Sequence, residues 1–174
     1  MTYASNQKRI IVDSSHCLGC KSCELKCAVD RNSLSKNLTE AVKETVLPRP
    51  RVYVEWNGEG SQPIQCRHCE DAPCLEICST GAMRRDPTTG ITFVEGNKCI
   101  ACWMCVMVCP YGVIAPATEK KSADKCDQCF QMPEPYCVAA CPTGALKVMT
   151  SEEFSAYLKE HRQNEILLQK DKIG

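Results

Sequence analysis

The apolar residues of this chain occur in short runs that are separated by polar turns. In the segment ITFV at 91–94, apolar residues alternate at Ile91 and Phe93, and less regularly at Val94. This alternation predicts a short strand. The turn signal DPTTG at 86–90 comes directly before it, so the pattern is typical of the second strand of a hairpin.

Two other segments carry helical signals. The sequence NLTEAVKETVL at 37–47 predicts a short helix that ends before Pro48. A second helix is predicted to begin at TSEE, a capping box with Thr150 as N-cap and Glu153 at the third helical position. Its apolar face would hold Phe154, Tyr157, Leu158 and His161, with Leu167 and Leu168 further on. This helix either packs on its own domain or docks a partner subunit.

Composition changes the picture, because this chain of 174 residues has sixteen cysteines but only three phenylalanines and two tryptophans. Something besides apolar burial must stabilise the fold, and disulfides and metal are the two usual devices. The first residues contain no apolar signal-peptide core, and the longest apolar run, at 100–110, is too short for a membrane span. We therefore expect a cytoplasmic protein whose reduced thiols bind metal.

The sixteen cysteines form four motifs of four, with none left over. The motifs are Cys17, Cys20, Cys23 and Cys27; Cys66, Cys69, Cys74 and Cys78; Cys99, Cys102, Cys105 and Cys109; and Cys126, Cys129, Cys137 and Cys141. The first and third motifs have the spacing C-x2-C-x2-C-x3-C. In two-cluster ferredoxins, three cysteines of such a run bind one 4Fe–4S cluster and the fourth binds the neighbouring cluster. Structural zinc is the alternative, but its paired C-x2-C knuckles usually lie a dozen or more residues apart.

The segments that flank the motifs repeat as well, and they indicate how the motifs pair. The second and third motifs enclose a TGA segment, the turn and the predicted strand, which together make a complete two-cluster unit. The two ends of the chain supply the same parts, because KRIIVDSSHCLGC at 8–20 leads into the first motif and TGALKV at 143–148 follows the fourth. We therefore expect the fourth and first motifs to form a circularly permuted copy of the second and third. The rival scheme pairs first with second and third with fourth, which leaves both terminal strands without hairpin partners.

Nested pairing predicts four ligand sets, named here after their clusters. Set A is Cys17, Cys20, Cys23 and Cys141; set B is Cys126, Cys129, Cys137 and Cys27; set C is Cys66, Cys69, Cys74 and Cys109; set D is Cys99, Cys102, Cys105 and Cys78.

The combination of PIQCRHCEDAPC (63–74), KCIACWMCVMVCPYG (98–112), KCDQC (125–129) and CVAACPTGAL (137–146) resembles the four-cluster ferredoxin-type electron-transfer subunits. Such subunits serve formate dehydrogenases, molybdopterin oxidoreductases, hydrogenase-linked complexes and carbon monoxide dehydrogenases. The compact chain is most similar to the soluble subunits of carbon monoxide dehydrogenase and tungsten aldehyde oxidoreductase systems. The resemblance implies four 4Fe–4S clusters in anaerobic metabolism and no bond chemistry. It also implies a tungsten, molybdenum or carbon monoxide dehydrogenase subunit on one side, and a flavoprotein, hydrogenase or ferredoxin on the other.

The remaining polar and aromatic candidates are interpreted as surroundings of the clusters. His16 and His68 adjoin ligand cysteines, and sixteen thiolates already fill sixteen iron positions. We therefore expect neither histidine to bind iron; each would support a cluster, for example through a hydrogen bond to cysteine sulfur, or lie at the surface. Trp103, with Met104, Val106, Met107 and Val108, is expected to exclude water around the third motif. The formal net charge of zero suggests no nucleic-acid partner.

These observations predict an α+β protein of two ferredoxin-like halves, each holding two 4Fe–4S clusters, related by pseudo-twofold symmetry. The four-cluster domain would span 1–149, with one half at 8–36 plus 120–149, the other at 50–119, and the C-terminal helix at 150–174. Electrons would pass singly between neighbouring clusters, and copies could join into longer wires. The alternatives are a non-redox structural or assembly protein that metal holds together, and a catalytic enzyme with one modified cluster.

Overall fold

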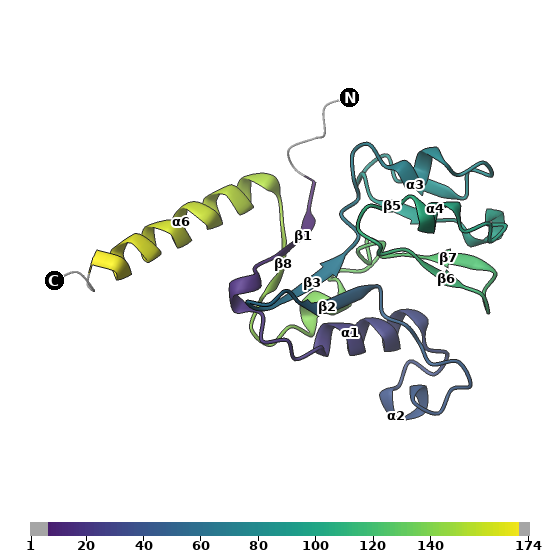
Figure 1. Cartoon of the computed structure of the whole chain (residues 1–174), viewed down its shortest axis with the longest axis horizontal. Helices are drawn as coiled ribbons and strands as arrows, with labels where there is room; N and C mark the ends of the chain where they lie inside the picture. Colours follow the sequence, from purple (N-terminus) through teal and green to yellow (C-terminus); the bar gives the residue numbers. More distant parts are fainter. Residues whose placement is uncertain (1–6, 171–174) are drawn as a thin grey trace.

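The computed structural model describes the backbone of residues 7–170 and the side chains of residues 7–161. The fold is α+β and consists of short helices and two-stranded antiparallel sheets (Figure 1). The strands are β1 (Arg9–Val12), β2 (Val52–Trp56), β3 (Ser61–Gln65), β4 (Met83–Arg85), β5 (Thr92–Val94), β6 (Ala115–Ala117), β7 (Ser122–Asp124) and β8 (Leu146–Met149). The α-helices are α1 (Ser22–Cys27), α2 (Leu38–Ala41), α3 (Pro73–Glu76), α4 (Met104–Met107), α5 (Tyr136–Ala139) and α6 (Ser151–Lys170).

The predicted strands at the two ends of the chain pair with each other. β1 and β8 are antiparallel, with Arg9 opposite Met149 and Val12 opposite Leu146. β4 and β5 form the equivalent hairpin, in which the predicted turn is closed by Asp86, whose Oδ1 accepts the amide of Thr89 at 2.7 Å. Both strand pairings expected from the flanking repeats are therefore present.

Each cysteine motif contains one of four short helices, and these helices pack in two pairs. α1 packs against α5, so the first and fourth motifs are neighbours, and α3 packs against α4, so the second and third are neighbours. Pro73 occupies the first turn of α3, where its missing N–H costs nothing. Pro110 and Pro142 follow α4 and α5, as their inability to continue a helix predicts.

The apolar core is divided in the same way. One cluster joins β1, α1 and β8, and it includes Val52 and Val54 of β2; the other joins α3, β4 and Ile114, and it includes Ala123 of β7. Val52 and Val54 lie inside the range 50–119 expected for the other half, and Ala123 lies inside 120–149. Each expected half therefore has in its core a strand that we had assigned to the other half. The reason is that hairpins β2–β3 and β6–β7 cross between the two.

The predicted helix at 37–47 is much shorter in the structure. Only Leu38–Ala41 is helical, with the Asn37 side chain as N-cap accepting the Thr39 amide at 2.9 Å. The following chain turns because the Glu44 carboxylate reaches back to the Ser33 hydroxyl at 2.5 Å and the amides of Leu34 and Ser35 at 3.0 and 3.1 Å. These bonds outweigh the helical propensity of the segment.

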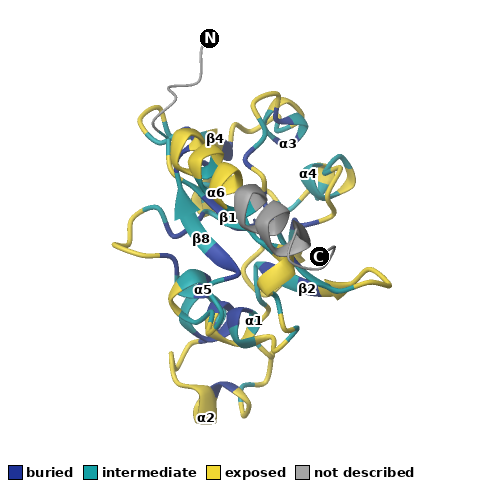
Figure 2. Cartoon of the chain, turned by 90° about the vertical axis from the view of Figure 1, so that its left-hand side faces the viewer, coloured by how far each residue is buried: buried dark blue, intermediate teal, exposed yellow. Residues whose placement is uncertain are grey.

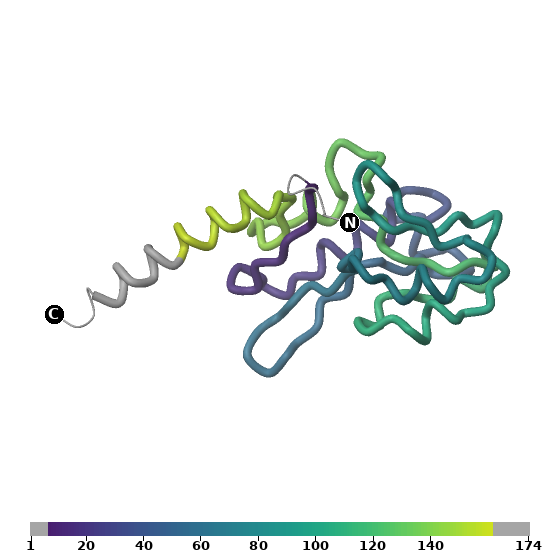
Figure 3. The backbone as a smooth tube through the Cα atoms, turned by 90° about the horizontal axis from the view of Figure 1, so that it is seen from above, coloured from purple at the N-terminus to yellow at the C-terminus, as the bar shows by residue number. Residues whose placement is uncertain are grey.

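The C-terminal helix α6 begins with the predicted capping box. The Glu153 amide donates to Thr150 Oγ1 at 3.1 Å, and the Thr150 amide donates to Glu153 Oε2 at 2.8 Å. The first turns contact β8, and residues 151–161 lead away from the body with a mostly exposed surface (Figures 2 and 3). The side chains of Leu167 and Leu168 lie outside the described residues. Within the part of the chain that the structure describes, no helix is long and apolar enough to cross a membrane.

Candidate metal centres

The four cysteine loops share one backbone feature. The residue two positions after the first cysteine of each motif has a positive φ: +69° at Gly19, +50° at His68, +56° at Ala101 and +53° at Gln128. Side chains rarely adopt this conformation, and here it recurs in register in all four loops. A left-handed residue next to right-handed ones turns successive N–H groups to one side, which is a geometry that binds anions and iron–sulfur clusters.

In two of these loops the left-handed turn brings an amide to the sulfur of the first cysteine. The His68 amide donates to Cys66 Sγ at 3.4 Å, and the Gln128 amide donates to Cys126 Sγ at 3.3 Å. Cysteines at the last position of a motif receive similar bonds, since the amides of Arg51 and Met83 lie 3.3 Å from Cys27 Sγ and Cys78 Sγ. Such bonds stabilise thiolate sulfur and raise the reduction potential of a cluster bound to it.

The α1–α5 pair brings together cysteines of the first and fourth motifs. Burial, together with the charges of Glu24 and Cys141, raises the pKa of Cys23 to about 11. Burial, together with the charges of Cys27 and Cys129, raises the pKa of Cys137 to about 12. Cys141 is thus an electrostatic neighbour of set A, and Cys27 of set B.

The α3–α4 pair brings together cysteines of the second and third motifs. Burial raises the pKa of Cys74; the charge of Lys125 opposes the rise, and the charges of Cys66, Cys109 and Cys69 add to it. A small cavity beside α4 is lined by all four cysteines predicted as set D, together with Trp103, and by apolar side chains of both strands of the β4–β5 hairpin; these cysteines are Cys78, Cys99, Cys102 and Cys105.

The exposure of the cysteines follows the four sets. All four cysteines of set B are buried, and set C contains buried and half-buried ones. Sets A and D each have one exposed cysteine, Cys20 and Cys102, at equivalent positions of the first and third motifs. Cys66 and Cys126 share a small buried cluster with Val113, so sets B and C meet in the interior.

The spacing of the sulfurs tests whether the donors fit a single ion. Four thiolates around tetrahedral zinc would lie about 3.8 Å apart, because each Zn–S bond is about 2.3 Å long. Across the described residues, which include all sixteen cysteines, every group of three cysteine sulfurs contains a pair more than 4.8 Å apart. This spacing is too wide for tetrahedral zinc, whereas an all-thiolate donor set with wider spacing suits a 4Fe–4S cluster.

A buried polar network joins the second motif to the fourth, and the sequence pattern did not predict it. His68 Nδ1 accepts the Thr92 amide at 3.0 Å, and Lys125 Nζ donates to Thr92 Oγ1 at 2.8 Å and to the carbonyl of Cys126 at 3.1 Å. Burial, together with the charge of Lys125, lowers the pKa of His68 to about 2, so the imidazole is neutral. Thr92 is therefore the most buried residue of β5, and the apolar Phe93 beside it is only half-buried.

The other predicted surroundings of the clusters are only partly enclosed. Trp103 lines the cavity of set D, but Met104 and Met107 are 45% and 80% exposed, so the third motif lacks the continuous dry shell that we expected. The short helix α4 explains the difference, because it presents only one side to α3. His16 lies near the surface, with Nδ1 2.8 Å from Asp13 Oδ2.

Comparison with known proteins agrees with this chemistry. The family described as "4Fe-4S dicluster domain" matches residues 60–151. Electron transport protein HydN of Escherichia coli K12 is 35% identical over 91% of this chain and 97% of its own length. An iron–sulfur protein of Rhodospirillum rubrum is 36% identical over 90% of each chain. The thiosulfate reductase electron transfer subunit PhsB of Salmonella typhi is 33% identical over 84% of this chain and 78% of its own.

Proposed function

Because the chain belongs to the 4Fe–4S dicluster family of ferredoxin-type electron-transfer subunits of oxidoreductases, we propose that it relays single electrons through four 4Fe–4S clusters. Its role is electron transport and not catalysis, as in the relatives named above. The observation that carries the proposed arrangement is the cavity whose lining includes all four set D cysteines, three from the third motif and Cys78 from the second.

We propose the nested assignment of ligands, with sets A, B, C and D each holding one cluster. The pairing of β1 with β8 supports it, because this hairpin brings the first and fourth motifs together from opposite ends of the chain. The helix pairs α1–α5 and α3–α4 support it as well. The two pseudo-twofold halves would be 8–36 with 120–149 and 50–119, with β2 and β7 each packing into the core of the other half.

The order of the sets suggests a path for electrons. Cys23 lies near Cys137, Cys126 near Cys66, and Cys105 near Cys74, which connects set A to B, B to C and C to D. Each bound cluster would accept and release one electron. Because only the sets at the two ends of this path have an exposed cysteine, redox partners would dock at sets A and D.

The protein residues would keep this path insulated and fixed. Burial of set B excludes water from the middle of the path, and the amides of Arg51 and Gln128 stabilise its sulfurs. The fourth cysteine of each motif belongs to the neighbouring set, so the backbone ties adjacent clusters together.

One partner would be the catalytic subunit of an oxidoreductase. PhsB is named as an electron transfer subunit of thiosulfate reductase, which supports a catalytic oxidoreductase partner here. We propose that this partner is a molybdenum or tungsten enzyme or a carbon monoxide dehydrogenase. The second partner would be a flavoprotein, hydrogenase or soluble ferredoxin, and the exposed ends would also allow copies to join into longer wires. We propose that these exchanges occur in the cytoplasm, where sixteen thiols stay reduced.

The cysteine pairing can be tested by counting iron in double variants. Cys20→Ala and Cys141→Ala fall in one set in the nested scheme, so combining them should remove one cluster and leave about twelve irons per chain. Cys102→Ala with Cys141→Ala is the matched control, because Cys102 occupies the position equivalent to Cys20. That pair falls in two sets and should leave about eight irons.

The rival pairing predicts the opposite result, since Cys102 and Cys141 would then share a cluster. Wild-type protein purified anaerobically should contain about sixteen irons and show broad, spin-coupled EPR signals after dithionite reduction. Zinc in place of iron, with a silent spectrum, would exclude electron transfer and favour a structural role.

A further inference from the structure

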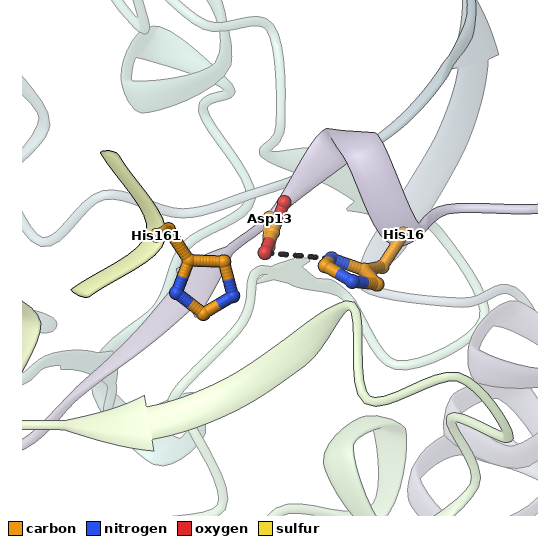
Figure 4. A group of neighbouring side chains, drawn as sticks. All are labelled: Asp13, His16 and His161. Carbon is orange, nitrogen blue, oxygen red and sulfur yellow. Dashed lines mark hydrogen bonds and ion pairs between the residues drawn. The ribbon is translucent and has the colours of Figure 1, made fainter. Parts of the chain in front are cut away.

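Two of the three histidines of the chain meet an aspartate beside the first cysteine motif, since His16 directly precedes Cys17. His16 follows β1 in the sequence, and His161 lies on α6, 145 residues later. Donor atoms of Asp13, His16 and His161 all lie within 4.8 Å of one another, and the described residues contain no other group of three such donors at this spacing (Figure 4).

The distances suit a small coordinated ion. Asp13 Oδ2 and His16 Nδ1 are 2.8 Å apart. Two ligands with bonds of about 2.1 Å at the tetrahedral angle would be about 3.4 Å apart, so this pair needs to open by only about 0.6 Å to bind one ion. The His16 side chain is 47% exposed, which leaves the site open to solvent and to water as a further ligand.

The hydrogen bond of His161 is that of a metal ligand. His161 Nδ1 lies 3.0 Å from the carbonyl of Tyr157, which can only accept, so Nδ1 carries the proton and Nε2 offers a lone pair. Figure 4 shows the other ring nitrogen of His161 on the side of Asp13. Metal-binding histidines typically donate their second nitrogen to a carbonyl in this way.

The carboxylate is held as firmly as the imidazole. Asp13 Oδ1 accepts the Ser15 hydroxyl at 2.5 Å, and Oδ2 accepts the Tyr157 hydroxyl. Tyr157 is fixed in turn by Lys147 Nζ, which lies 2.9 Å from its oxygen. Burial alone would raise the pKa of Asp13, but these bonds and the bond with His16 outweigh burial and lower it. The carboxylate is therefore ionised at neutral pH.

We propose that Asp13, His16 and His161 bind a divalent transition-metal ion of the class that favours two imidazoles and one carboxylate, such as Zn²⁺. The ion joins the segment after β1 to the third turn of α6 and fastens this helix to the body. Its three donors include none of the sixteen cysteines, although His16 directly precedes Cys17, and it gives His161 a role that the helical pattern of the tail had assigned to packing.

Equilibrium dialysis of the anaerobically purified holoprotein against micromolar Zn²⁺ would test the site, with iron measured in the same samples. Wild type should bind one Zn²⁺ per chain without losing iron. His161→Asn and Asp13→Asn should weaken binding at least tenfold. Glu160→Gln is the matched control, because it changes an exposed neighbour on the same helix and should leave binding unchanged.

Hydrogen exchange gives a second measurement. Added Zn²⁺ should slow amide exchange in residues 154–161 of wild type and of Glu160→Gln, but not of His161→Asn. Equal Zn²⁺ binding by wild type and His161→Asn would overturn the proposal. Binding that releases iron would overturn it too, because the cysteines would then be the ligands.

Discussion

Lys125 places a cationic side chain between the cysteines of sets B and C. Its ammonium group is buried, donates to Thr92 and to the carbonyl of Cys126, and acts electrostatically on Cys74. A buried charge is costly unless hydrogen bonds and opposite charge surround it. An electron that arrives on a cluster adds negative charge, so a cation at this position favours the reduced state of the two interior clusters.

We therefore expect Lys125→Met to make the reduction potential of an interior cluster more negative. The shift should be about 60 mV, which corresponds to a tenfold change in a one-electron equilibrium. An EPR-monitored redox titration would measure it, and Lys43→Met would serve as control, because Lys43 is exposed and forms an ion pair with Glu40 at 2.9 Å. Unchanged potentials in a variant with full iron content would contradict this role.

Among the elements, the segment that contains α2 depends on one carboxylate. The hydrogen bond from the Ser33 hydroxyl lowers the pKa of Glu44 most, and the bonds from Ser35 and from the amide of Leu34 lower it as well. A carboxyl group whose pKa is lowered on folding stabilises the protein at pH values above its ordinary range, and this contribution is lost as the pH falls through the lowered value. At neutral pH the anion is therefore what holds residues 33–44 in a closed loop.

Glu44→Gln should loosen this loop, because an amide oxygen is a weaker acceptor than a carboxylate. Amide exchange of residues 34–44 at pH 7 should accelerate severalfold, with the rest of the chain unchanged. Glu40→Gln is the matched control, since Glu40 bonds only to the exposed Lys43. Equal acceleration in both variants would mean that the general charge of the segment, and not the Glu44 bonds, closes the loop.

At the scale of the whole molecule, the burial of each cysteine set determines how early an oxidant reaches its cluster. Cysteines of set B lie within two clusters of buried apolar residues. Cys20 and Cys102, at the two ends of the path, are exposed. An oxidant reaches exposed clusters first, and a cysteine released from a cluster becomes open to alkylation.

Brief exposure to oxygen followed by iodoacetamide should therefore label sets A and D before set B. Mass spectrometry of the peptides would give the order, with Cys20 and Cys102 modified earliest and Cys126 and Cys137 last. The fully reduced, anaerobic sample is the control and should be labelled little. Early labelling of Cys137 would contradict the proposed interior position of set B.

The local spacing of residues determined a large part of this protein. The cysteine intervals predicted four motifs, the apolar segments predicted strands β1, β5 and β8, and TSEE predicted the start of α6. These features depend on residues within about ten positions of one another, where spacing and backbone propensity decide the outcome. The β1–β8 pairing was also accessible, because the same order of segments occurs twice in the chain.

Other features were decided only by the tertiary structure. The alternation in β5 could not show that Thr92, and not Phe93, would be the buried residue, because His68 and Lys125 come to it from other motifs. Likewise, nothing local to Asp13 or His161 indicates that they meet. Contacts between distant segments depend on how the helix pairs and hairpins pack, and a single sequence specifies that packing only through the sum of many weak interactions.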